Sequence, residues 1–397
     1  MSITLIRLPL KTRLEAPDKE FLTSAGPGWR LSLYLPFTKS WREPLEDKIL
    51  LRDLRREARA ALENHFASPF EQESLLAHVD ALLAEPDASR LAGEGLALFA
   101  GEGKVLAVLL PQAPAASVQV DRRFRLQGIL PQLFGRDRYY LLKLSQQSVR
   151  LWDCDGVAMF PVSLEGLDTD IRETPHFGDA QRQTSLHTNS AGHHGQGRGD
   201  VAHSGAGPGD GKDGKSEIET FFRQIDHGIQ SRMTGPAVPL LLAGVEFLMP
   251  IYRKVNTYKG LLGSELPGNP EASGSLADLH VRANALIAER ERAERNAAMG
   301  MFVENLARAR SCAGYTDTVP CAVQGRLTHL FLEQGAPRWG AFESGSGRTD
   351  LWDVYRDGAE DLANLACIHA YHGRARIYAF AAGDLPDGAG IAGLCRT

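Results

Sequence analysis

The sequence predicts an α/β protein with two or three domains. The chain has 397 residues, and at about 150 residues per domain this length allows two or three hydrophobic cores. Hydrophobic residues make up 43% and charged residues 23% of the chain, the composition of an ordinary globular protein. Runs with strand-like alternation follow one another along the chain with helical stripes between them. This order is typical of strand–helix–strand crossovers.

The first part of the chain mixes strands and helices. Residues 29–37 (WRLSLYLPF) alternate as a strand does, and residues 95–111 predict a hairpin that turns between Gly101 and Lys104. Residues 43–66 predict a helix. We expect its apolar stripe to contain Leu45, Ile49, Leu50 and Leu54. Its arginines are expected to form a solvated face in preference to a nucleic-acid contact: Arg52, Arg55, Arg56 and Arg59.

A second region begins near Gly128. Residues 138–162 predict three strands separated by turns, and residues 216–233 predict a helix. The apolar face of that helix is expected to contain Ile218, Phe221, Phe222, Ile225 and Ile229. Ser216 and Glu219 have the spacing of a capping box at its start.

Further along the chain, strands and helices alternate again. Residues 239–247 predict a buried strand, followed by a short helix that contains Tyr252. Residues 266–275 are typical of a linker, and residues 276–310 predict a long helix that breaks near Gly300. The C-terminal part predicts a strand, a helix and a strand at residues 326–334, 358–372 and 375–382.

Charge, cysteine content and hydropathy predict a cytoplasmic protein without a membrane partner. The net charge of −5 argues against a protein coated in positive charge but allows a local basic face. Five cysteines without a CxxC pair indicate neither a disulfide framework nor a zinc ribbon, so we expect reduced, mostly buried thiols. Residues 1–21 lack the long apolar region of a signal peptide, and no apolar run reaches the ~18 residues of a membrane span.

The segment from about Thr174 to Lys215 is poor in apolar residues and predicts a long mobile loop. Gly209 to Ser216 (GDGKDGKS) fits the phosphate-loop pattern, but no buried strand precedes it, so the sequence favours a chance match. Four histidines lie in the loop: His187, His193, His194 and His203. Imidazoles suit zinc or nickel. Without paired cysteines or an HExxH helix, however, we expect no cofactor and no dedicated metal site.

The tip of the loop reads HHGQGRGD, from His193 to Asp200. Gly195 and Gly197 allow close approach to another surface, and the Gln196 side chain offers one acceptor and two donors but never titrates. Such a tip does no proton chemistry of its own, yet it can place a water or a backbone N–H against a reacting ester. The composition alone is equally typical of a permissive surface loop.

The order of these parts resembles the archaeo-eukaryotic release factor superfamily, which includes Pelota, and in particular its bacterial branch. The residues that carry the resemblance are the loop tip, the helix at 216–233, the strand and helix at 239–255, and the C-terminal segments GRLTHLFLEQG, DLANLACIHAYHGRARIYAFAAGDLP and GIAGLCR. The family's loop ends in Gly-Gly-Gln, and here His194 replaces the first glycine. A codon-reading motif of the Asn-Ile-Lys-Ser kind is absent from the first domain.

The resemblance implies three domains: an N-terminal α/β domain at 1–128, a central RNase H-like domain at 129–270 with the loop at 174–215, and a C-terminal α/β domain at 271–397 that resembles kink-turn-binding proteins. It implies a ribosome-associated release or rescue factor whose loop promotes peptidyl-tRNA hydrolysis only on the ribosome. The implied partners are the ribosome, ribosomal RNA and peptidyl-tRNA. The implied acting residues are His194, Gly195, Gln196 and Gly197.

Two alternatives stay open at this point. The first is a non-catalytic protein of the same fold that binds the ribosome or a structured RNA. The second is a metal-dependent hydrolase that uses the loop histidines. The oligomeric state has no signature in the sequence.

Overall fold

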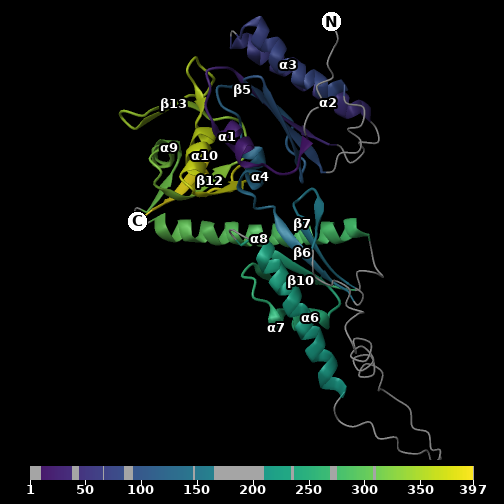
Figure 1. The fold of residues 1–397 in the computed structure, drawn as a ribbon. Helices are drawn as coiled ribbons and strands as arrows, with labels where there is room; N and C mark the ends of the chain where they lie inside the picture. The colour runs from purple at the N-terminus through teal and green to yellow at the C-terminus, as the bar shows by residue number, and fades with distance from the viewer. Residues whose placement is uncertain are drawn as a thin grey trace, which may run out of the picture. The chain divides into compact units, whose positions relative to one another are not determined.

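The computed structural model describes residues 10–37, 44–65, 67–84, 93–145, 148–164, 210–233, 237–268, 275–306 and 310–396 (Figure 1). It divides into two compact units. The first unit combines Met1–Asp137 with Ala288–Thr397, and the second is Arg138–Ile287. Both units combine helices with sheets, which confirms the α/β fold class. The three-domain division stays a prediction. Within the described ranges, no helix is long and apolar enough to cross a membrane.

The N-terminal segment of the first unit carries a five-stranded sheet in the order β1-β4-β3-β2-β5. Its strands are β1 (Leu10–Lys11), β2 (Arg30–Pro36), β3 (Gly95–Gly101), β4 (Lys104–Leu110) and β5 (Ser117–Asp121). β3 and β4 form the predicted hairpin. Its two turn residues, Glu102 and Gly103, have φ values of 52° and 71°. Positive φ at both positions is the geometry of a turn whose twist matches that of the strands.

The described part of the same segment contains the helices α1 (Ala16–Thr23), α2 (Pro44–Asn64), α3 (Pro69–Ala84) and α4 (Leu130–Phe134). α2 packs on β2, β5 and α3. Its buried stripe contains Leu51, Leu54, Ala58 and Leu62. The predicted stripe is therefore rotated, because Leu54 belongs to it while Ile49 is 48% exposed. Arg55 pairs with Asp80 of α3, so this arginine supports helix packing.

The C-terminal segment of the first unit carries a four-stranded sheet, β11-β17-β12-β16, and a three-stranded sheet, β14-β13-β15. The strands are β11 (Ser311–Ala313), β12 (Leu327–Glu333), β13 (Trp339–Glu343), β14 (Arg348–Leu351), β15 (Glu360–Asp361), β16 (Arg376–Phe380) and β17 (Ile391–Cys395). α9 (Tyr315–Val323) packs against β11 and β17, and α10 (Leu362–His372) packs against β12 and β16. β12 and β16 are parallel, as the predicted crossover requires.

One hydrophobic core joins the two segments of the first unit. It contains Phe99 and Leu126 from the N-terminal segment together with Leu330 and Leu365 from the C-terminal segment. Because these residues share a core, the first unit is stabilised by contacts between segments that are far apart in the sequence.

The second unit carries a mixed five-stranded sheet in the order β10-β9-β6-β7-β8. Its strands are β6 (Tyr139–Leu144), β7 (Val149–Cys154), β8 (Met159–Val162), β9 (Leu240–Gly244) and β10 (Leu261–Pro267). β6, β7 and β8 are the three predicted strands and are antiparallel, whereas β9 and β10 run parallel to β6 and β9 respectively. α6 (Asp210–Arg232) lies between β8 and β9 in the chain, and α7 (Leu248–Val255) lies between β9 and β10.

One strand of this unit was not predicted, and one prediction about the following helix is wrong. β10 was not expected, because residues 261–267 contain Gly263 and Pro267 and show no regular alternation. The long helix α8 (Leu276–Asn305) continues through Gly300 without the predicted break. Burial of Ala298 and Phe302 on either side of Gly300 offsets the cost of a glycine inside a helix, which is about 1 kcal/mol.

Candidate functional site

The residues predicted to act, His194, Gly195, Gln196 and Gly197, lie outside the described residues. The four loop histidines lie outside them as well. The structure does describe β8 and α6, the two elements that flank the loop segment in the sequence. β8 ends at Val162 and α6 begins at Asp210, so both belong to the second unit.

α6 is fixed to the second unit by an apolar face. The buried residues of this face are the predicted ones, Ile218, Phe221, Phe222, Ile225 and Ile229. The ring of Phe222 meets the ring of Tyr252 on α7 edge to face, with their centroids 5.6 Å apart. Burial of five large apolar side chains gives this helix a fixed position on its sheet.

Polar contacts add a second attachment between α6 and the chain around α7. The Glu219 carboxylate accepts from the Lys254 ammonium at 2.7 Å and from the Arg223 guanidinium at 3.4 Å. The hydrogen bond from Lys254 lowers the pKa of Glu219. The Asp226 carboxylate accepts from the backbone N–H and the hydroxyl of Thr257, at 3.1 Å and 2.5 Å. The segment that precedes α6 is thus attached to a well-anchored helix.

The capping box predicted at Ser216 is wrong. α6 begins at Asp210, so Ser216 is exposed inside the helix, where its carbonyl accepts from the Thr220 hydroxyl at 2.9 Å. Glu219 binds Lys254 instead of a helix end. Glycine and lysine residues before Ser216 were assigned to the loop, but residues 210–215 of the predicted loop are helical. The same helix covers residues 210–216 of the phosphate-loop pattern, which leaves no glycine-rich turn there to surround a phosphate.

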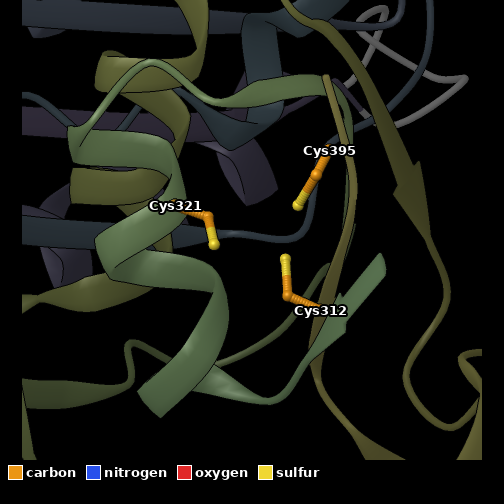
Figure 2. Close-up of side chains that lie close together, drawn as sticks. All are labelled: Cys312, Cys321 and Cys395. Carbon is orange, nitrogen blue, oxygen red and sulfur yellow. The ribbon is translucent and has the colours of Figure 1, made fainter. Parts of the chain in front are cut away.

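A second group of reactive side chains lies in the first unit. Cys312 on β11, Cys321 on α9 and Cys395 on β17 place their sulfur atoms within 4.8 Å of one another. Figure 2 shows the three side chains pointing toward a common centre. Sequence spacing gave no indication of this cluster, because its members lie on three separate elements and form no CxxC pair.

Electrostatics distinguish the three thiols. The hydrogen bond with Cys312 and the positive charge of Arg326 lower the pKa of Cys321 to about 6. The same hydrogen bond, together with burial, raises the pKa of Cys312, and burial raises the pKa of Cys395. Cys321 is therefore the most acidic thiol of this cluster.

Comparison with known proteins gives one family match, which covers the second unit. Residues 139–289 match the family model described as "Bacterial archaeo-eukaryotic release factor family 7". The curated proteins give no match. The match covers β6 to β10 and therefore includes both ends of the loop segment.

Solved structures give weaker likenesses. An archaeal translation termination factor, aRF1, is 14% identical over 96% of each chain, with a TM-score of 0.24. Archaeal Pelota, from a model of ribosome-bound Pelota and ABCE1, is 12% identical over 79% of this chain and 74% of its own, with a TM-score of 0.41. Dom34 of S. cerevisiae is 9% identical over 76% of this chain and 79% of its own, with a TM-score of 0.37. At these TM-scores the solved structures define neither the fold nor the function of this chain.

The resemblance drawn from the sequence is confirmed by the family match. Over residues 139–289, the chain is similar to the bacterial archaeo-eukaryotic release factor family, the bacterial branch of the superfamily that the sequence resembles.

Proposed function

We propose that this chain is a ribosome-associated release or rescue factor that promotes hydrolysis of the peptidyl-tRNA ester through residues 194–197. The observation that carries the proposal is the family match over residues 139–289, which contain that tetrapeptide. The proposed partners are the ribosome, ribosomal RNA and peptidyl-tRNA, and the proposed location is the cytoplasm.

The proposed chemistry is positioning rather than proton transfer. Gln196 orders the attacking water, or the backbone beside it, through its amide group. Gly195 and Gly197 allow the backbone to approach the ester closely. An amide does not titrate, so the surrounding RNA supplies most of the electrostatic stabilisation of the reacting ester.

The framework of the second unit suits this role. Catalytic loops act best when a rigid scaffold positions their ends. Phe222 and Ile225 of α6 are fully buried, and Glu219 pairs with Lys254 on α7. The sheet of three antiparallel strands followed by two parallel strands supports the RNase H-like assignment of this domain. The three-domain organisation, with a C-terminal domain like that of kink-turn-binding proteins, is part of the proposal.

The test measures release of labelled peptide from ribosomes that carry peptidyl-tRNA. We expect release by the parent and its loss in Gln196→Ala. Gln183→Ala is the matched control, because Gln183 belongs to the same loop segment but lies outside the tip. Release that persists in Gln196→Ala would contradict the proposal.

His194 favours one second candidate, a non-catalytic factor that occupies the ribosome or a structured RNA. A side chain at this position limits backbone freedom where the family has a glycine. This candidate predicts binding to ribosomes or RNA that survives Gln196→Ala, with no peptide release by either protein. Binding is compared over a salt series, because phosphate contacts weaken steeply with ionic strength.

A further inference from the structure

The cluster of Cys312, Cys321 and Cys395 has the geometry of a binding site. β11 and β17 are antiparallel, and Cys312 lies opposite Gly393. Residues two apart on a strand share a face of the sheet, so Cys395 points to the same side as Gly393 and Cys312. α9 packs on these two strands and brings Cys321 to that side (Figure 2).

Gly393 leaves the space that the cluster occupies. A Cβ atom at position 393 would lie 3.1 Å from the Cys312 sulfur and 2.7 Å from Cδ2 of Leu327. Since a Cβ does not fit there, any larger residue displaces the Cys312 thiol or Leu327. β17 therefore contributes the Cys395 thiol and, at Gly393, the space for the Cys312 thiol.

We propose that Cys312, Cys321 and Cys395 bind one thiophilic divalent cation of the zinc class. Zinc–thiolate bonds are about 2.3 Å long, so two sulfurs of a tetrahedral site lie about 3.8 Å apart. The three sulfurs here lie within 4.8 Å of one another, and small side-chain rotations bring them to that spacing. Cysteine thiolates are soft ligands that select zinc or copper(I) over harder cations.

Charge selects the divalent ion. Three thiolates and one divalent cation leave one net negative charge. The Arg326 guanidinium donates to the Cys321 sulfur at 3.0 Å and neutralises that charge. A monovalent cation would leave one negative charge uncompensated among groups that are largely buried, which is unfavourable.

Burial of the cluster is suited to tight binding and to entry of the ion. Cys312 and Cys321 are 8% and 6% exposed, whereas Cys395 is half-buried. The buried pair excludes water from one side, and the Cys395 side gives the ion access. Among the described residues, the cluster offers three protein ligands, all of them cysteines. Solvent or an added ligand therefore supplies the fourth position of a tetrahedral site.

The test uses Co²⁺ as the probe on the reduced, metal-free full-length protein. We expect a near-ultraviolet Co²⁺–thiolate charge-transfer band that saturates at one equivalent and disappears when Zn²⁺ is added. Imidazole ligands give no such band, which separates this site from the histidines at 187, 193, 194 and 203. A missing band at stoichiometric Co²⁺ overturns the proposal, and so does a disulfide between two of these cysteines in the protein as isolated.

Variants assign the band to these residues. Cys395→Ala removes the least buried ligand. It is expected to reduce the band by about one third and to weaken Co²⁺ at least about 10-fold. Cys367→Ala is the matched control, because Cys367 is buried in the same unit but is not part of the cluster. A band unchanged in Cys395→Ala, or lost in Cys367→Ala, contradicts the assignment.

Arg326→Gln tests the charge argument without removing a ligand. We expect the full charge-transfer band and an affinity about 10-fold weaker, measured by competition with a chromophoric chelator. Because all three thiols remain, this variant tests the site even where a cysteine variant fails to fold. Unchanged affinity would show that Arg326 does not balance the charge of the bound ion and would overturn the choice of a divalent cation.

Discussion

Asn364 on α10 accepts a hydrogen bond from the backbone N–H of Leu126 at 3.0 Å. Its side-chain amide also donates to the carbonyl of Phe124 at 2.7 Å. Asn364 is 1% exposed, so one side chain satisfies two backbone groups in a buried place. These two hydrogen bonds connect the N-terminal and C-terminal segments of the first unit.

Replacement of Asn364 by alanine is expected to destabilise the protein by about 3 kcal/mol. Two buried backbone groups lose their partner, and each unpaired group costs about 1–3 kcal/mol. Urea unfolding followed by circular dichroism measures the loss. Asn305→Ala is the control, because Asn305 makes one local bond to the Met301 carbonyl and should shift stability by less than about 0.5 kcal/mol. Equal losses of stability in the two variants would contradict the stabilising role of the hydrogen bonds that Asn364 makes between the segments.

The shared core of the first unit gives a prediction about fragments. Residues 1–137 expressed alone lose the C-terminal half of the core that Phe99 and Leu126 share with Leu330 and Leu365 in the whole chain. We expect this fragment to bind a hydrophobic dye and to unfold without cooperativity. Co-expression with residues 288–397 should restore a cooperative transition. A fragment of residues 1–128 that folds by itself would instead support the three-domain division.

The buried carboxyl group of Asp121 is expected to make the stability of the protein depend on pH. The pKa of Asp121 is raised to about 7, mainly by burial, and the negative charges of Asp361 and Glu360 contribute to that shift. In the unfolded chain an aspartate titrates near 3.9, within the usual range. Between about pH 4 and pH 7 the folded protein therefore retains a proton that the unfolded chain has released. The contribution of Asp121 to the free energy of unfolding therefore falls as the pH rises through this window.

Asp121→Asn should remove that part of the pH dependence. We expect the variant to be more stable than the parent at pH 8, by on the order of 4 kcal/mol, and equal to it below about pH 4. The asparagine oxygen still accepts from the Arg122 N–H, as the Asp121 carboxylate does at 2.6 Å. Urea unfolding at pH 4 and pH 8 gives the two values. Glu57→Gln, on the exposed side of α2, should retain the parent slope. Identical slopes for the parent and Asp121→Asn would contradict the assignment.

The elements that the sequence predicted well have strong local patterns. β2, β3, β4, β6, β7 and β8 alternate or form short apolar runs, and the buried face of α6 has helical spacing over five residues. β10 was not predicted because its sequence shows no regular alternation of apolar and polar residues. It lies at the edge of its sheet, next to β9. The cluster of three thiols was not predicted either, because tertiary packing, rather than spacing in the sequence, brings the cysteines together.

Ser216 tests where α6 begins. Ser216 is exposed within the helix, so Ser216→Ala should change the free energy of unfolding by less than about 0.5 kcal/mol. A capping residue at that position would cost about 1 kcal/mol when replaced by alanine. Lys215→Ala should be equally neutral, and neither the parent nor the variant should bind ATP or GTP. Nucleotide binding that disappears in Lys215→Ala would revive the phosphate-loop interpretation.

The last prediction concerns His194. His194→Gly restores the Gly-Gly-Gln tripeptide of the family, and we expect it to raise peptidyl-tRNA hydrolysis or leave it unchanged. The reason is backbone freedom, because glycine reaches positive φ without a steric cost and brings no Cβ toward the ester. Gly195→Ala should abolish the activity by the converse effect, without unfolding the protein, since the sequence predicts a loop poor in apolar residues at this position. His193→Gly is the control, because it changes the neighbouring histidine and leaves the tripeptide as it is. Rates are compared on peptidyl-tRNA-loaded ribosomes, with equal binding of all four proteins verified first. If the parent and His194→Gly both bind but neither releases peptide, the binding role replaces the hydrolytic one.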